Sequence, residues 1–260
     1  MRLPLYQVDA FTTRRFTGNP AAVCPLPRWF PDPLLQQIAA ENNLAETAYI
    51  VREPEGFRIR WFTPTVEVDL CGHATLAAAY VLMDCLGFGG DRVTFHSRSG
   101  ALTVDRASEL YTLDFPARPG QPIPFDPAVS AALGEPPEAL FLARDLLCVY
   151  RTAAQVRALQ PNWEALAALE PFAVIVTAPG DDCDFVSRFF APKQGIDEDP
   201  VTGSAHCTLA PYWSGRLGKS SLFARQVSAR GGELWCESRE DRVRISGHGA
   251  LYLTGFIEVD

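Results

Sequence analysis

Hydrophobic and polar positions alternate along most of the chain, which predicts many short strands and few helices. Runs rich in β-branched and aromatic residues are interrupted by Gly, Pro, Asn and Asp. In the first half we predict strands at residues 5–11, 21–25, 47–51, 57–62, 92–96, 101–105 and 110–114. In the second half we predict them at 140–143, 147–151, 172–176 and 185–190, with short alternating segments from 222 to the end.

Helical patterns are fewer and differ in polarity. Residues 74–86 are apolar and Ala-rich with no polar face, which is typical of a buried helix. Residues 203–217 can form a second helix, which we expect Pro211 to bend or shorten. A helix should begin at Asp32, with Pro33 in its first turn, and end near residue 42, and residues 163–169 also read as helical.

Three short motifs recur in the same order at a nearly constant offset. The segment 60–64 (RWFTP) recurs 128 residues later as RFFAP, and Gly72-His73-Ala74 recurs after 131 residues as Gly203-Ser204-Ala205. The segment 48–51 (AYIV) recurs after 125 residues as AVIV. This order favours two structurally related domains over a coincidence of short apolar words. The Pro-rich stretch 116–127 predicts the boundary, giving domains 1–115 and 116–248.

Composition narrows the functional classes. The 260 residues carry a net charge of −8 and only two lysines, which argues against nucleic-acid binding. We find no signal peptide and no apolar run of membrane-spanning length. Seven scattered cysteines without a CxxC motif suggest the reduced cytoplasm.

Cofactor motifs are missing as well. The sequence has neither GxGxxG nor a P-loop, and neither lysine lies in a motif typical of pyridoxal phosphate. His96 and His248 have no partners at metal-ligand spacing, so we expect no cofactor and no metal.

The repeated glycine motifs suggest anion binding. A small-residue loop that leads into a helix leaves backbone N–H groups free at its positively polarised start. Two pseudo-symmetric domains could hold a small carboxylate in a cleft between two such starts, at Gly72 and Gly203. The alternative is that these glycines only begin buried helices.

Four motifs together resemble one known family. They are FTGNPAAV at 16–23, NLAETA at 43–48, FTP with VDLCGHAT at 62–75, and DPVTGSA at 199–205. They resemble the phenazine-biosynthesis isomerase (PhzF-like) family, which shares the diaminopimelate epimerase fold. The resemblance implies an α+β protein with two pseudo-symmetric domains. Each domain would be a curved, mostly antiparallel sheet or barrel around one central helix.

The resemblance also implies that strand 249–260 returns to the first domain and that the protein is a homodimer. It places Glu46, His73 and Asp199 in the site.

Glu46 is the candidate acid/base. Its apolar neighbours would raise the pKa of a carboxyl there, and the repeat places Pro171 opposite it, so the fold does not require a carboxylate. His73 at a helix start should be neutral and contact a substrate carboxylate or enol. Asp199 could orient a substrate amine or hydroxyl, or simply cap a helix.

The remaining candidates are weaker. We expect Ser204 to complete the second anion site with Gly72 and Gly203, and Asn19 to contact substrate unless Gly18-Asn19 is only a turn.

Cys71 raises the possibility of a two-thiol racemase. The second domain has Val201 and Thr202 at the corresponding point, which disfavours that mechanism. We therefore predict a cofactor-independent isomerase that moves a proton on a small carboxylic acid. The alternatives are a two-base amino-acid epimerase using Cys71 and a non-catalytic binding protein.

Overall fold

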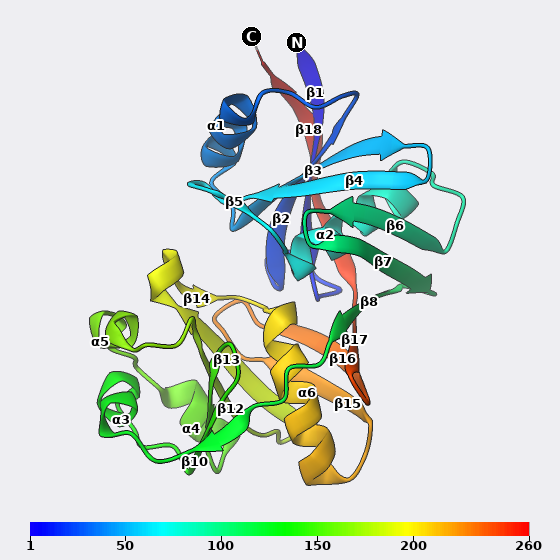
Figure 1. Cartoon of the computed structure of the whole chain (residues 1–260). Coiled ribbons are helices and arrows are strands. Elements are labelled where there is room, and N and C mark those ends of the chain that lie inside the picture. Colours follow the sequence, from blue (N-terminus) through cyan, green and yellow to red (C-terminus); the bar gives the residue numbers. More distant parts are fainter. Residues whose placement is uncertain (260) are drawn as a thin grey trace. The chain divides into compact units, whose positions relative to one another are not determined.

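The chain forms two compact units in the computed structural model, which describes residues 1–259 (Figure 1). Unit 1 consists of residues 1–114 together with the segment that begins at Ser246. Unit 2 consists of residues 115–245. Each unit contains one buried helix and a curved sheet, so the α+β class predicted from the sequence is confirmed.

Unit 1 is built on strands that wrap around one helix. Its elements are β1 (Arg2–Ala10), β2 (Asn19–Leu26), α1 (Asp32–Asn42), β3 (Glu46–Glu53), β4 (Gly56–Phe62), β5 (Glu67–Val68), α2 (Gly72–Tyr80), a π-helical turn (Val81–Cys85), β6 (Arg92–Ser97), β7 (Gly100–Ala107), β8 (Leu110–Pro116) and β18 (Gly249–Glu258). Helix α2 contacts β1, β2, β3, β7 and β18, while α1 packs on β3 and β4.

Strand pairing in unit 1 follows a defined order. β1 pairs antiparallel with β2, β2 runs parallel to β3, and β3 pairs antiparallel with β4. β4 then pairs antiparallel with β5 and parallel with β6, which pairs antiparallel with β7.

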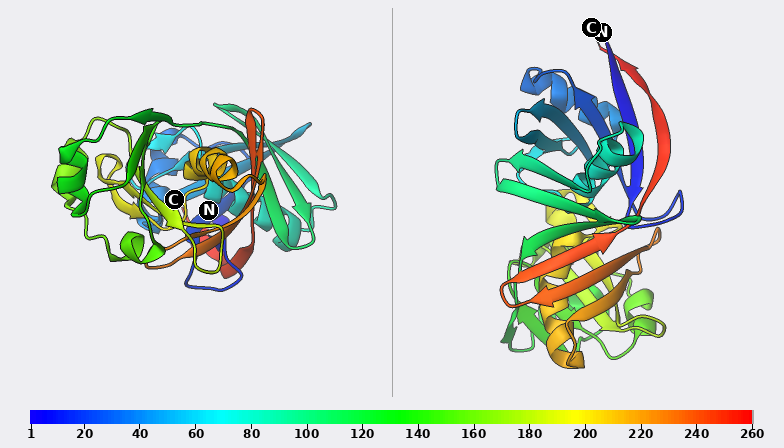
Figure 2. Two further views of the ribbon diagram at one scale, coloured as in Figure 1. Left: turned by 90° about the horizontal axis from the view of Figure 1, so that it is seen from below. Right: turned by 90° about the vertical axis from the view of Figure 1, so that its right-hand side faces the viewer.

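The last strand, β18, pairs antiparallel with β1 along its length, and the backbone N–H of Val259 donates to the carbonyl of Met1 at 2.7 Å. Both ends of the described chain therefore lie side by side in unit 1 (Figure 2).

Unit 2 contains more helices on its periphery. Its elements are β9 (Gln121–Ile123), α3 (Pro127–Leu133), β10 (Ala139–Leu142), β11 (Leu146–Val149), α4 (Ala153–Ala158), α5 (Trp163–Ala168), β12 (Val174–Pro179), β13 (Phe185–Ala191), a 3₁₀ turn (Pro192–Gln194), β14 (Ile196–Asp199), α6 (Gly203–Leu217), β15 (Ser221–Gln226), β16 (Gly232–Arg239) and β17 (Arg242–Gly247), which extends two residues past the unit boundary.

The strand pairings of unit 2 repeat those of unit 1. β10, β11, β12 and β13 pair antiparallel, parallel and antiparallel in turn. β13 pairs antiparallel with β14 and parallel with β15, and β15 pairs antiparallel with β16. In each unit the central helix follows the short strand, β5 or β14, so the motif repeat reflects a repeated topology.

A partly buried arginine–carboxylate pair is also repeated. Arg60 on β4 donates through Nε and Nη2 to both oxygens of Glu67, each at 2.7 Å. Arg188 on β13 donates in the same way to Glu198, at 2.8 and 2.9 Å. Two parallel bonds fix the planar guanidinium, so each pair ties the central strand to the short strand before the central helix.

The two central helices are buried for different reasons. In α2 every residue from His73 to Ala79 is buried, and the small alanines allow strands to approach on all sides. In α6 the larger Trp213 fills the core, stacks on Phe185 and donates from its indole to Thr177 at 3.0 Å.

Pro211 does not shorten α6, and its expected bending of the helix stays a prediction. The helix continues from Gly203 to Leu217 through the proline. Proline lacks the N–H that would bond the carbonyl of Cys207, four residues earlier. That carbonyl instead accepts the backbone N–H of Arg118 at 2.8 Å, which removes one cost of the proline.

The Pro-rich segment is more ordered than a linker. Within it, β9 pairs antiparallel with β10 and extends the sheet of unit 2.

Among residues 1–259, no helix combines the length and the apolar character needed to span a membrane.

Candidate active site

Unit 1 brings three of the candidate residues into direct contact. Glu46 is the first residue of β3, His73 is the second residue of α2, and Asn19 is the first residue of β2. Strand β2 runs parallel to β3 with Ala21 opposite Glu46, so their starts lie near each other. Gly18 adopts φ +70°, and a Cβ there would lie 2.3 Å from the carbonyl oxygen of Ala10, so the turn before Asn19 requires glycine.

The closest contact joins His73 to Glu46. His73 Nε2 lies 3.1 Å from Glu46 Oε2, with side-chain exposures of 6% and 13%. Neither atom has a separate hydrogen-bond partner among the described residues. A buried carboxylate and imidazole that meet only each other form a pair suited to hold or release a proton.

Asn19 and Cys71 contact the other ring nitrogen. The side-chain amide nitrogen of Asn19 lies 3.2 Å from His73 Nδ1, and Cys71 Sγ lies 3.6 Å from it. In the neutral ring, Nδ1 would accept from the Asn19 amide and Nε2 would carry the proton that faces Glu46. Asn19 is fully buried and holds the ring in this structure, so its predicted contact with substrate stays a prediction.

The electrostatics of the cluster centre on His73. Burial lowers the pKa of His73, whereas negative charge on Cys71 and Glu46 raises it, and the resulting pKa is well above the usual value. This reverses the neutral ring that we expected from the helix start alone. Burial raises the pKa of the Cys71 thiol, and the nearby Glu46 raises it further, while His73 lowers it.

Glu46, Cys71 and His73 also form a group of potential metal ligands. One ligand atom from each lies within 4.8 Å of the others. Sequence spacing alone missed this cluster, because Glu46 lies on a strand that precedes Cys71 by 25 residues.

Unit 2 gathers the other candidates at the start of α6. Asp199 ends β14, and its carboxylate accepts from the hydroxyl of Thr202, the residue before α6. Gln226 accepts from the backbone N–H of Thr202 at 2.9 Å and donates to the carbonyl of Asp199 at 2.7 Å. Gln226 therefore braces the loop from both ends.

Ser204, the second residue of α6, accepts from Arg144 at 3.3 Å. Arg144 is fixed by two bonds to the buried carboxylate of Asp145, at 2.8 and 2.9 Å, and lies over the ring of Phe172. Sequence reasoning missed Gln226 and Arg144. A glutamine at an inward position of an otherwise apolar alternating strand, after Leu222 and Ala224, was the available signal for Gln226.

The two helix starts share one property. Within residues 1–259, the residue before each helix, Cys71 or Thr202, makes no side-chain capping hydrogen bond. Gly72 and Gly203 are the first residues of these helices, as the anion-site hypothesis requires. Unsatisfied N–H groups and the helix dipole together attract an anion.

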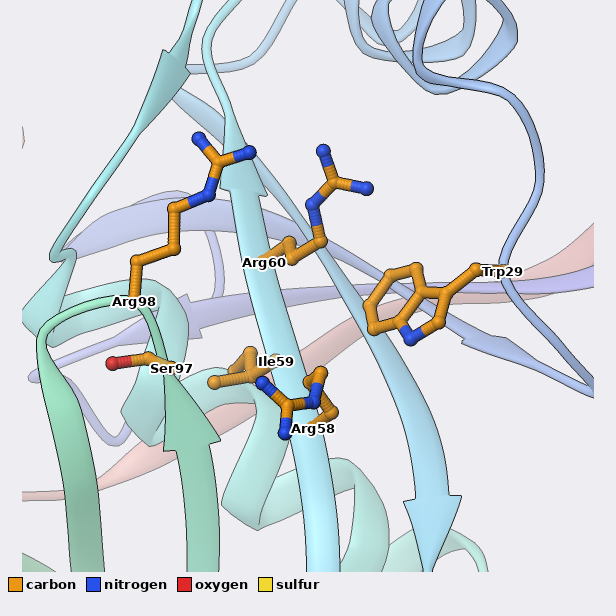
Figure 3. A pocket seen from close by; sticks show the side chains of 6 residues that line it. All are labelled: Trp29, Arg58, Ile59, Arg60, Ser97 and Arg98. Atoms are coloured by element: carbon orange, nitrogen blue, oxygen red, sulfur yellow. The ribbon is translucent and has the colours of Figure 1, made fainter.

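A separate surface pocket on unit 1 lies away from this chemistry. It has a volume of about 260 Å³ and is lined by Trp29, Arg58, Ile59, Arg60, Ser97 and Arg98 (Figure 3). Its arginines pair with Glu53, Glu67 and Asp32. The residues that line this pocket include none of Glu46, Cys71 and His73, so we place the candidate active site at that cluster, at the start of α2.

Comparisons with known proteins agree with this placement of motifs on the fold. The family model described as phenazine biosynthesis-like protein (PhzC–PhzF) matches residues 8–255. An uncharacterized isomerase of Pseudomonas aeruginosa is 54% identical over 260 residues and is covered completely, as is this chain.

Solved structures show the same relationship. The crystal structure of a PhzF-family phenazine biosynthesis protein from Enterococcus faecalis has a TM-score of 0.98 at 48% identity, with complete coverage of both chains. A probable proline racemase from Agrobacterium radiobacter shares the fold, with a TM-score of 0.65 at 12% identity and coverage of 99% and 93%. From the length of the family match and these identities, the chain belongs to the phenazine biosynthesis-like (PhzC–PhzF) family.

Proposed function

We propose that this protein is an isomerase that moves a proton on a small carboxylic acid, with Glu46 as the single acid/base. One observation carries the proposal: Glu46 Oε2 lies 3.1 Å from His73 Nε2 in a nearly closed environment. Relatives that align over the whole chain are named isomerases, which supports the reaction class.

The reaction needs no change of oxidation state. The Glu46 carboxylate takes a proton from a carbon next to an unsaturated or activated group, and the C–H electron pair spreads into the substrate as an enolate or dienolate. Glu46 then returns the proton to a different carbon, and the double bond shifts. His73 orients Glu46 and balances the negative charge of the carboxylate before it takes the substrate proton and after it returns it.

Negative charge that develops on the substrate needs preorganised donors. The first-turn N–H groups at Gly72 and His73 would supply such donors beside Glu46, and the first turn of α6 offers a second set at Gly203 and Ser204. Asp199 would orient a substrate hydroxyl or amine. A chain of net charge −8 thereby binds an anion through backbone donors.

The test is deuterium uptake from heavy water into a panel of small β,γ-unsaturated carboxylic acids. We expect enzyme-dependent uptake that is lost in Glu46→Gln, whose amide cannot accept a proton. The matched control is Glu41→Gln on the exposed side of α1, which should exchange like the wild type. Undiminished uptake in Glu46→Gln would remove Glu46 from the mechanism.

Two other functions are less supported. A two-base epimerase needs Cys71 as a thiolate, but burial raises the pKa of its thiol, and the matching position in unit 2 is Thr202. Full exchange in Cys71→Ser would eliminate it. A non-catalytic binding protein would bind carboxylates without any exchange. The homodimer and the cytoplasmic location expected from the sequence stay predictions.

A further inference from the structure

We propose that Glu46, Cys71 and His73 form a binding site for a thiophilic divalent cation such as Zn²⁺, and that the bound ion inhibits the enzyme. The binding half depends only on the geometry of unit 1. The inhibition half rests on the proposed function, because it assumes that Glu46 is the acid/base.

The ligand chemistry suits zinc. Sulfur, imidazole nitrogen and carboxylate oxygen are its three common protein ligands, and three such ligands with one open position make an accessible site. Two of these residues, Cys71 and His73, are buried, and Glu46 is mostly buried, so their ligand atoms meet each other and not bulk water. Glu46 Oε2 and His73 Nε2 have no separate hydrogen-bond partner to give up.

The spacing suits a tetrahedral ion. With Zn–S near 2.3 Å and Zn–N near 2.05 Å, tetrahedral angles separate sulfur and nitrogen by roughly 3.5 Å and nitrogen and oxygen by roughly 3.3 Å. The structure has 3.6 Å between Cys71 Sγ and His73 Nδ1, and 3.1 Å between His73 Nε2 and Glu46 Oε2.

These two distances involve different ring nitrogens, so a single ion requires one ligand to move. All three ligand atoms lie within 4.8 Å of one another, so the separation of any pair has to shorten by no more than roughly 1.5 Å. Binding through Nδ1 would also displace the amide of Asn19, which is 3.2 Å away.

Binding would block catalysis directly. The ion takes the lone pair with which Glu46 accepts the substrate proton. The Cys71 thiol releases its proton as the S–metal bond forms, and His73 releases to solvent any proton on the ring nitrogen that binds the ion. No redox step and no further reactant are involved. Removal of the ion by a chelator, with a proton returning to Cys71, would restore the free acid/base.

The experiment uses Co²⁺ as a spectroscopic probe for Zn²⁺ on the full chain. We expect tetrahedral cobalt absorption in the visible range together with a thiolate-to-cobalt charge-transfer band, and displacement of both by Zn²⁺. Cys71→Ser should lose the charge-transfer band. Cys85→Ser, at a half-exposed thiol elsewhere in unit 1, should keep it.

A second variant covers the case in which Cys71→Ser does not fold. Glu46→Gln should keep the charge-transfer band but bind Co²⁺ at least tenfold more weakly. No absorption change at a large molar excess of Co²⁺, or an unchanged charge-transfer band in folded Cys71→Ser, would overturn the site.

The inhibition is measured separately by deuterium uptake. We expect Zn²⁺ to stop the exchange and a chelator to restore it. Cobalt binding at Cys71 with undiminished exchange would overturn the inhibition and leave the binding site standing. Undiminished exchange in metal-free Glu46→Gln would instead overturn the proposed function.

Discussion

The starts of α2 and α6 have the same backbone arrangement but different surrounding side chains. Both helices begin with glycine after an extended residue, Cys71 or Thr202, and neither has a side-chain cap. In unit 1 the hydroxyl of Thr75 donates to the carbonyl of Cys71, four residues earlier. In unit 2 Nδ1 of His206 donates to the carbonyl of Thr202, also four residues earlier, at 2.8 Å.

The difference lies in what surrounds each start. Unit 1 places a carboxylate, Glu46, against an imidazole, His73, whereas unit 2 has Ser204 with a guanidinium, Arg144. Asp199 in unit 2 is bonded to Thr202, and Gln226 braces its backbone. Under the proposed function, the shared backbone would supply anion binding, and side chains would supply proton chemistry in unit 1.

The largest effect on activity should come from replacing His73 in unit 1 with serine, the residue at the matching position, Ser204, in unit 2. His73→Ser removes the partner of Glu46, and we expect a loss of about 10²-fold or more in deuterium exchange. Ser204→Ala removes one hydroxyl in unit 2 and should cost less. Equal losses in both variants would break the proposed division of labour between the two starts.

The repeated arginine pairs should differ in their contribution to stability. Arg188→Leu strands the mostly buried carboxylate of Glu198 and removes donors to the carbonyls of Val156 and Leu159, so we expect a loss of about 3–4 kcal/mol in the free energy of unfolding.

Arg60→Leu should cost less, about 2–3 kcal/mol, because Arg98 still lies 2.9 Å from Glu67. Urea unfolding measures both variants. The double variant Arg188→Leu with Glu198→Leu should recover most of the loss, and a loss as large as that of Arg188→Leu alone would contradict the stranded charge as its cause.

Acid should destabilise the folded protein because His206 would have to take up a proton. Thr75, which makes the matching hydrogen bond in unit 1, cannot ionise in this way. Burial lowers the pKa of His206 from its usual 6.5 to about 4. Between these values the unfolded chain binds a proton that the folded protein does not, so stability falls as pH drops from about 6.5 to 4, by roughly 3 kcal/mol. His206→Gln should lack this part of the pH dependence in unfolding measurements at pH 7, 5.5 and 4. A variant with the same acid sensitivity as the wild type would exclude His206 as its source.

The smallest effect concerns the matching bond in unit 1. Thr75→Val keeps the shape but loses the hydroxyl that donates to the carbonyl of Cys71. We expect a loss of about 1 kcal/mol in the free energy of unfolding, the usual net value of one hydrogen bond. Unchanged stability would show that the carbonyl is satisfied by the helix alone, through the N–H of Thr75 at 3.2 Å.

The fold could be predicted from the sequence because the same motifs occur in both units in the same order. RWFTP and RFFAP lie on β4 and β13, and the two glycine motifs begin α2 and α6. The alternation of apolar residues located most strands, since each strand faces a buried core on one side. Helix α6 keeps its full length through Pro211 because a backbone N–H from a distant segment satisfies the carbonyl of Cys207, and no local pattern reveals such a partner.

The candidate site was predictable only in part. The sequence motifs predicted that Glu46 and His73 lie near the start of α2 and that Asp199 lies near the start of α6. The roles of these three residues stay predictions. The contact between Cys71 and His73, the bracing by Gln226 and the position of Arg144 all arise from tertiary packing. Burial lowers the pKa of His73, but negative charge on Cys71 and Glu46 raises it, against the direction expected from the helix start alone.

The distribution of thiols offers a practical route to measuring motion. All seven cysteines are unpaired, five are buried, and the two more accessible ones are Cys85 in unit 1 and Cys183 in unit 2. Burial raises the pKa of both accessible thiols, so labelling should be slow at neutral pH and faster in mild base. The natural protein thus carries one attachment point per unit for a donor–acceptor dye pair, and energy transfer between the dyes would report directly whether carboxylate ligands or Zn²⁺ change the distance between the units.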